Sequence, residues 1–129
     1  MAITKIDGIM LKEMFSSGAA LLVQNRDSVD ALTVFPVPDG DTGSNMSQTI
    51  TSAVKEMNSK RLTSVSDIAD AVARGALKGA RGNSGVILSQ ILRGLAKGMA
   101  GCEDIDCTVL RQAFREAANT AYKAVMKPK

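Results

Sequence analysis

The stretch L-S-Q-I-L-R-G-L-A-K-G-M-A-G, residues 88 to 101, determines the fold class of this 129-residue chain. Its large apolar residues recur at intervals of three and four, the spacing that places them on one face of an α-helix. They are Leu88, Ile91, Leu92, Leu95 and Met99. Gly101 follows as the expected C-cap, because glycine readily adopts the left-handed conformation that ends many helices. The stretch therefore predicts a long amphipathic helix.

The same period recurs in four further segments, and alternation with a period of two is nearly absent. The apolar stripes run through Leu11, Met14, Phe15, Gly18 and Leu22; through Met46, Ile50, Ala53, Val54 and Met57; through Ile68, Ala69, Val72 and Ala76; and through Leu110, Ala113, Phe114, Ala117, Ala121 and Val125. A short helix or turn is expected over 28–32, and Pro36 stops the β-rich residues 33–35. We predict an all-α chain, folded as one domain over 1–129 into an antiparallel up-and-down bundle. The last stripe is still apolar where the sequence stops, so the domain is expected to be incomplete at its C-terminus.

The composition excludes several kinds of chemistry. With 45% hydrophobic and 22% charged residues the chain is typical of a globular protein. It contains no histidine, which excludes a Ser-His-Asp catalytic unit and a zinc or haem site with histidine ligands. Any activity must therefore use carboxylates, hydroxyls, amides, lysine, arginine and backbone dipoles.

Charge and cysteine content point away from nucleic acids and from secretion. The net charge is +3, the basic residues are dispersed, and only four side chains are aromatic, so nucleic-acid binding is not expected. Cys102 and Cys107 are too few for a four-thiolate zinc site. The chain has no apolar signal core at its start and no apolar run near the ~18 residues of a membrane span. We expect a cytoplasmic protein with reduced thiols and no membrane span.

The helical pattern fails over V-F-P-V-P-D-G-D-T-G-S-N-M, residues 34 to 46. Two prolines stiffen the approach to Asp39, and Gly40 frees the backbone between Asp39 and Asp41. Two carboxylates this close can face one point, where paired hard oxygen ligands suit Mg²⁺. The helix that Thr42 opens would add its positive dipole end, which suits phosphate. The alternative is that Asp41 or Thr42 only caps this helix.

A second irregular loop is G-A-R-G-N-S-G, residues 79 to 85, directly before a helix. Its three glycines allow the backbone to approach a ligand closely, and Asn83 and Ser84 add hydrogen-bonding groups, as in a phosphate cradle. The alternative is a plain turn, in which Gly75 and Gly79 only permit close helix packing. If the stripes on either side of residues 58–65 form one antiparallel hairpin, both loops lie at the same end of the bundle. They would then share a metal and nucleotide site.

The strings V-F-P-V-P-D-G-D-T-G-S-N-M and G-A-R-G-N-S-G-V-I-L-S-Q resemble the nucleotide-binding domain of the dihydroxyacetone-kinase L family. The resemblance covers essentially the whole chain and is closest to the ATP-binding domain of bacterial fatty acid kinases. It implies an eight-helix antiparallel barrel that binds ATP at one end. It matches Asp39 and Asp41 to the ligands of two Mg²⁺ ions. By the same resemblance Thr42, Gly43 and Asn45 line the nucleotide, and Asn83 and Ser84 contact its phosphates.

The implied activity is metal-assisted phosphoryl transfer. In the fatty acid kinases the acceptor is a fatty-acid carboxylate that a separate lipid-binding protein presents, and the product is an acyl phosphate for phospholipid synthesis. At the third metal ligand, where the family usually has Asp or Asn, this sequence has Thr33, and Asp30 lies three residues off register. The alternatives are a glycerone-type kinase acting on a small keto-alcohol and a non-catalytic nucleotide-sensing module.

The resemblance stops after Lys127 and Pro128, before the helices that close the family's barrel. We therefore expect the 129-residue chain alone to self-associate through its last stripe, to bind nucleotide weakly and to transfer no phosphate.

Overall fold

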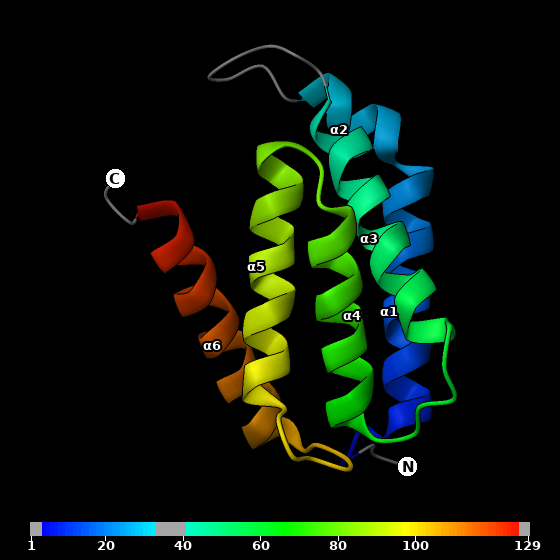
Figure 1. Ribbon diagram of the computed structural model, residues 1–129, viewed down its shortest axis with the longest axis vertical. Helices are drawn as coiled ribbons and strands as arrows, with labels where there is room; N and C mark the ends of the chain where they lie inside the picture. The colour runs from blue at the N-terminus through cyan, green and yellow to red at the C-terminus, as the bar shows by residue number, and fades with distance from the viewer. Residues whose placement is uncertain (1–3, 33–40, 127–129) are drawn as a thin grey trace.

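The structure is a computed structural model that describes residues 4–32 and 41–126. These two ranges contain six α-helices and no β-strand, and a single antiparallel bridge joins Ile6 to Ile105. The helices are α1 (Gly8–Gln24), α2 (Arg26–Leu32), α3 (Thr42–Asn58), α4 (Val65–Gly79), α5 (Gly82–Gly98) and α6 (Cys107–Met126) (Figure 1). The prediction of an all-α chain is confirmed.

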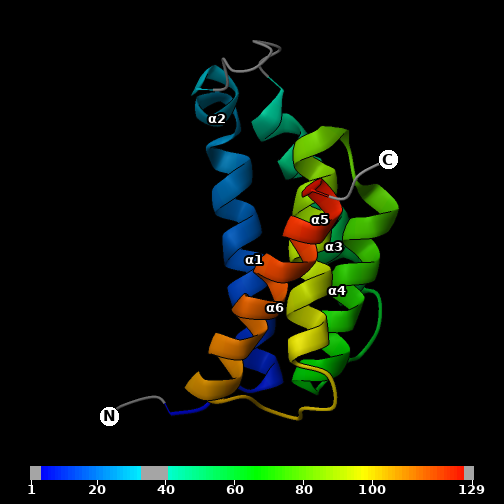
Figure 2. The ribbon, with the colours of Figure 1, turned by 90° about the vertical axis from the view of Figure 1, so that its left-hand side faces the viewer.

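The long helices run alternately up and down the long axis of the molecule (Figure 1). From α3 to α6 each helix packs against the next one, and α1 packs against α3 and α4. The short helix α2 lies over the start of α3. Among the described helices α6 contacts only α5, so it forms one edge of the bundle, on the other side from α1 (Figure 1). Figure 2 views the bundle from the side of α6. The up-and-down arrangement is the predicted one, with six described helices where the resemblance implies eight.

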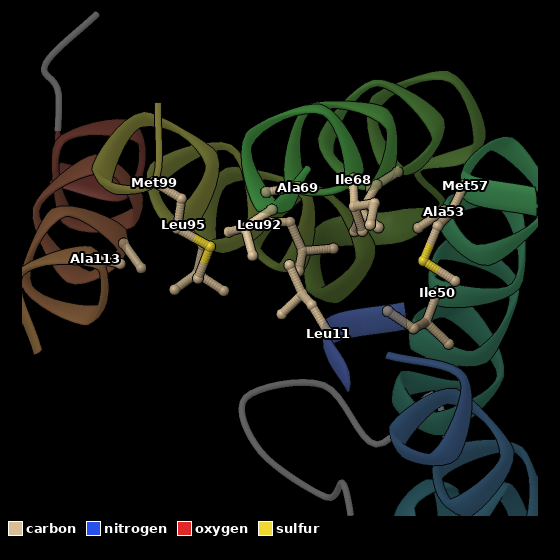
Figure 3. Close-up of a cluster of buried hydrophobic side chains, with 14 of the residues drawn as sticks. Leu11, Ile50, Ala53, Met57, Ile68, Ala69, Leu92, Leu95, Met99 and Ala113 are labelled. Carbon is tan, nitrogen blue, oxygen red and sulfur yellow. The ribbon is translucent and has the colours of Figure 1, made fainter. Parts of the chain in front are cut away.

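One hydrophobic cluster holds these helices together (Figure 3). Met57 of α3 and Ile68 of α4 are fully buried in it, and Met99 extends it beyond the end of α5. The stripes predicted for α3, α4 and α5 all face this cluster, either buried or packed against it at its margin, except Met46, which is half-buried. Burying one such large side chain contributes about 1.5–3 kcal/mol, so the three central helices carry most of the core.

The predicted stripe of α6 is partly wrong. The buried face contains Ala113, Ala117 and Thr120, whereas Phe114 and Val125 are 58% and 57% exposed. The reason lies in α5, where a β-carbon added to the glycine at 94 or at 98 would stand 2.4 Å from the Cα atom of Ala117 or Ala113, respectively. Backbones that approach this closely leave room only for small side chains, so the largest apolar residues of α6 turn outward.

Two smaller expectations also fail. Met14 and Gly18 of α1 are exposed, because α1 meets α3 and α4 through the neighbouring face that carries Leu11 and Ala19. The C-cap of α5 is Met99, and Gly101 lies two residues beyond it in a turn at φ 79°.

Two remaining expectations concern thiols and membrane spans. Cys102 is half-buried, Cys107 is exposed, and both are free thiols. None of the helices in residues 4–32 and 41–126 is long and apolar enough to cross a membrane.

Candidate functional site

The described end of the first irregular loop, residues 41–46, meets the second loop at one end of the bundle. Helices α3 and α4 form an antiparallel pair, so α5 begins beside the start of α3 (Figure 1). The contact is close, because a β-carbon built on Gly82 would stand 2.3 Å from Asn45 Nδ2. The prediction that the two loops share one end is therefore confirmed for the described residues 41–46 and 79–85, whereas residues 34–40 lie outside the described part of the chain. Gly75 and Gly79 also have the packing role expected of them, since β-carbons there would collide with Ser52 of α3.

Thr49 ties the two segments together. Its side chain is fully buried, and its Oγ1 donates to the carbonyl oxygen of Asn45 at 2.8 Å and accepts from the N–H of Arg81 at 3.2 Å. A β-carbon on Gly85 would lie 2.4 Å from the same Oγ1 atom. Thr49 is not among the residues singled out by the sequence pattern. The sequence feature that could have identified Thr49 is its hydroxyl group, which lies one helical turn after Asn45 and next to the buried Ile50.

Among the described residues, no side-chain hydrogen bond caps the N-terminus of helix α5. Gly82 opens it at φ 67°, in the left-handed region that favours glycine. Arg81 is the N-cap residue, and its side chain makes no capping hydrogen bond. The N–H of Gly85 donates to the carbonyl oxygen of Arg81 at 3.1 Å, so the N–H groups before it stand at the positive end of the helix. Asn83 is exposed there and Ser84 is half-buried.

Helix α3 is capped from another helix. Asp41 is its N-cap residue and is exposed, but the carboxylate makes no capping hydrogen bond. The cap comes instead from Asp30 of α2, whose Oδ1 accepts from the N–H of Ser44 at 3.0 Å and whose Oδ2 accepts from the Ser44 hydroxyl at 2.7 Å. The alternative that the Asp41 side chain serves only as a cap is therefore wrong.

Hydrogen bonds from Ser44, first from its hydroxyl and then from its N–H, lower the pKa of Asp30 from its ordinary 3.8. Burial opposes these two bonds with a smaller effect, and the N–H of Gly43 and the positive charge of Arg26 lower the pKa of Asp30 further by lesser amounts. Asp30 is therefore an ionised carboxylate at neutral pH, placed at the first turn of α3. In the sequence Asp30 is three residues before the position of the family's third metal ligand. The structure nevertheless brings it to the end of the bundle where Asp41 lies.

Two further predicted residues lie at the start of α3. Gly43 is buried, and a β-carbon there would stand 2.2 Å from the carbonyl oxygen of Arg26. Gly43 therefore lets α2 sit directly on α3. Thr42 is half-buried beside it. The start of α3 thus contacts the start of α2 and the start of α5.

The remaining predicted ligands, Asp39 and Thr33, lie outside the described residues, so their role as metal ligands stays a prediction. Within residues 4–32 and 41–126 no three acidic or thiol side chains are grouped closely enough to hold a metal ion. Asp41 and Asp30 are the carboxylates that this part of the chain places at the start of α3. Both are hard oxygen donors, which fit Mg²⁺ better than a thiophilic metal.

A family model described as the DAK2 domain matches residues 36–129. The chain belongs to the DAK2 domain family. This is the dihydroxyacetone kinase L-type family to which both motifs pointed, and it is associated with kinases. The match begins at the proline-rich approach to the first loop and includes both helix starts described above.

Curated relatives of this DAK2 domain occur in staphylococci. It is 46% identical over 126 residues to an uncharacterized protein of Staphylococcus epidermidis. It is 47% identical to one of Staphylococcus haemolyticus and 45% identical to one of Staphylococcus aureus strain USA300. Each alignment covers 98% of this chain and 23% of the relative. The chain therefore spans about a quarter of the length of these proteins.

Proposed function

We propose that this DAK2 domain binds Mg²⁺ and ATP at the end of the bundle where α3 and α5 begin, as the nucleotide-binding part of a kinase. The observation that carries the proposal is the contact of Asn45 with Gly82. Through it an uncapped helix N-terminus lies beside a helix start that carries carboxylates. The N-terminus of α5 suits the phosphate groups of ATP, and the carboxylates at the start of α3 suit the metal ion that accompanies ATP.

The proposal assigns a role to each residue. Asp39 and Asp41 hold the metal. Asp30 is three residues before the position of the family's third ligand, but it lies at the start of α3, where it can contribute a further carboxylate oxygen. When bound, two Mg²⁺ ions would neutralise phosphate charge. On the other side of the site, Asn83, Ser84 and the free N–H groups of α5 hold phosphate oxygens. Thr42, Gly43 and Asn45 form the wall at the start of α3.

The acceptor that we propose is the carboxylate of a fatty acid. A carboxylate oxygen forms a bond to the γ-phosphorus while the bond from that phosphorus to the β,γ-bridging oxygen breaks, giving an acyl phosphate and ADP. The acceptor is already deprotonated, so the reaction needs no general base. This agrees with a chain that contains no histidine. The acceptor of a glycerone-type kinase is a hydroxyl group, which must lose a proton and so needs a general base. For this reason the glycerone-type kinase is the second candidate.

The proposal extends to partners. A separate fatty-acid-binding protein would present the acyl chain, and the acyl phosphate would serve phospholipid synthesis in the cytoplasm. A third candidate is a nucleotide-sensing module that transfers no phosphate. It would use the same end of the bundle, because binding needs only the helix starts and the metal.

Calorimetric titration of the chain with ATP, with and without Mg²⁺, tests the binding step. We expect saturable heat that depends on Mg²⁺, and no saturation in either condition would contradict the proposal. The acceptor is tested with hydroxylamine, which traps acyl phosphates, in a mixture of ATP, fatty acid and a lipid-binding protein with a longer chain that includes this domain. Phosphorylation of dihydroxyacetone instead would support the glycerone-type kinase. ADP binding without transfer to either acceptor would support the sensing module.

A further inference from the structure

A hollow of about 450 Å³ lies along α3, between that helix and the corner where α1 meets α2. This volume is within the range of small-molecule pockets. Its polar lining residues are Arg26, Ser44, Ser47, Gln48, Thr51, Ser52 and Lys55. All but the first belong to one face of α3, and Val23 of α1 is part of the opposite wall. Ile50 and Ala53, which carry α3 into the core, are not among its walls.

This hollow is separate from the proposed nucleotide site. Among the described residues that line it are none of Asp41, Thr42, Asn45, Asn83 and Ser84. Ser44 marks the nearest approach, and its hydroxyl is already bonded to Asp30. From there the hollow follows α3 for eleven residues to Lys55, about 16 Å at 1.5 Å per residue. It therefore leads away from the end of the bundle.

Ser47 has the unusual side chain of this hollow. It is only 5% exposed, and its Oγ has no hydrogen-bond partner in the part of the chain that the structure describes. A serine within a helix normally bonds to a carbonyl oxygen of the preceding turn, as Ser89 does with Val86. A buried hydroxyl without a partner costs stability. Rotation about the Cα–Cβ bond of Ser47 would offer this hydroxyl to an oxygen atom in the hollow.

Two cationic side chains line the hollow, and the nearby carboxylate of Asp30, which is bonded to the lining residue Ser44, lies near Arg26. Arg26 lies toward one end and Lys55 toward the other, and none of the described lining residues is acidic. The Nε atom of Arg26 lies 3.5 Å from Asp27 Oδ1, but both side chains are more than half exposed. Such a surface pair is weak, so the guanidinium remains available to a ligand. Arginine and hydroxyl groups together are typical donors to phosphate oxygens.

We propose that this hollow is a second binding site, for a small phosphate-bearing molecule. Arg26 and Lys55 supply the positive charge, and Ser47, Gln48 and Thr51 supply hydrogen bonds along α3. The inference is independent of the proposed function, because it needs neither Mg²⁺ nor the aspartates of the first loop. It also gives the unpaired hydroxyl of Ser47 a partner.

Inorganic phosphate is the probe, titrated into the ¹⁵N-labelled chain with a chelator present to remove Mg²⁺. We expect saturable shifts of the backbone amide signals of Ser47, Gln48 and Thr51. Lys55→Gln should weaken the affinity by about tenfold, while the matched variant Lys60→Gln, which removes an exposed charge outside the hollow, should leave it unchanged. Equal affinities of these two variants, or shifts that do not saturate, would overturn the proposal.

The variant Ser47→Ala tests whether the hydroxyl of Ser47 binds the ligand or is only a defect in packing. We expect its melting temperature to equal or exceed that of the original chain, because a buried unpaired group is removed. Its phosphate affinity should fall about fivefold, the loss of one hydrogen bond. An affinity equal to that of the original chain would overturn the proposal. Shifts confined to the amides of Asn83 and Ser84 would also overturn it, while supporting the proposed nucleotide site.

Discussion

Asn45 and Gly82 are in contact across the end of the bundle, with Asn45 Nδ2 only 2.3 Å from where a β-carbon on Gly82 would stand. The two residues are far apart in sequence, and each belongs to the first turn of a helix. Their contact brings the start of α3 and the start of α5 together, where the proposed site lies. Gly82 has two reasons to be glycine, the contact itself and its φ of 67°.

Gly82→Ala should lower both stability and nucleotide affinity. A left-handed alanine costs about 1–2 kcal/mol, and the new β-carbon must displace the side chain of Asn45. We expect a lower free energy of unfolding in urea and an ATP affinity reduced by about tenfold, which corresponds to about 1.4 kcal/mol. Denaturation followed by circular dichroism and calorimetric titration measure the two effects.

Gly101→Ala is the matched control. Gly101 also has a positive φ, 79°, but a β-carbon there would meet nothing within 4 Å. It lies in the turn after α5, at the opposite end of that helix from Gly82. This variant should lose a similar amount of stability and keep its ATP affinity. A loss of affinity in both variants would show that backbone strain alone, and not the contact with Asn45, weakens binding.

Asp39→Ala and Asp41→Ala should each abolish measurable affinity for Mg²⁺ and ATP. Removing one carboxylate leaves the metal charge poorly matched. The helices should persist, because Asp41 is exposed and its carboxylate does not cap α3. The control is Asp104→Ala, which removes an exposed carboxylate from the loop between α5 and α6. If both loop variants bind as the original chain does, with unchanged circular dichroism, the assignment of the metal ligands is wrong.

Ser84→Ala should weaken ATP binding by about 1 kcal/mol, a typical value for one hydrogen bond. Ser84 is half-buried in the uncapped first turn of α5, where it can bond to an outer phosphate. AMP lacks the outer phosphates, so its affinity should change little. Competition titrations with both nucleotides make the comparison. An equal loss for ATP and AMP would indicate a disturbed turn rather than a lost phosphate contact.

Much of the fold follows from the period of the apolar residues. The stripes through Ile50, Ile68 and Leu92 identify three helices and the faces that they bury. The same rule fails for Phe114, because it uses only the spacing of apolar residues. The glycines of α5 allow α6 to pack so closely that large side chains do not fit between the two helices. Long-range packing decides such an interface, and a local period does not record it.

The meeting of the two helix starts was predictable from the sequence, whereas several contacts around them were not. Prolines and aspartates mark the first loop and glycines mark the second, and the hairpin of α3 and α4 brings residues 41–46 and 79–85 to one end. The cap that Asp30 provides for α3 joins residues fourteen positions apart, and the bond from Arg81 to Thr49 spans thirty-two. Contacts at such separations depend on the packed structure, so sequence spacing alone left Asp30 off register and Thr49 unnoticed.

The contact between α2 and α3 should weaken in acid. The folded-state pKa of Asp30 is lowered from 3.8, chiefly by the hydroxyl of Ser44. The stability from this carboxylate is therefore fully present above pH 3.8 and is lost as the pH falls through the lower folded-state value. The difference in free energy of unfolding between the original chain and Asp30→Asn should shrink over that range. Urea denaturation at a series of pH values measures it.

Ser44→Ala provides the check on this cause. Without the hydroxyl donor, the pKa of Asp30 should rise toward 3.8, as followed by the NMR signal of its carboxyl carbon. A difference between the original chain and Asp30→Asn that stays constant as the pH falls would mean that this carboxylate adds no pH-dependent stability.

The chain should self-associate through the outer face of α6. Phe114 and Val125 are 58% and 57% exposed, and their spacing of eleven residues places them on one side of the helix. Burying one such side chain contributes about 1.5–3 kcal/mol, so Phe114→Ser should weaken the association by at least about tenfold. Sedimentation velocity over a range of concentrations measures the change. Leu77→Ser, which removes an exposed apolar residue from α4 (63% exposed), should leave association unchanged. A chain that remains monomeric at every concentration, or equal effects of the two variants, would show that the outer face of α6 is not the contact surface.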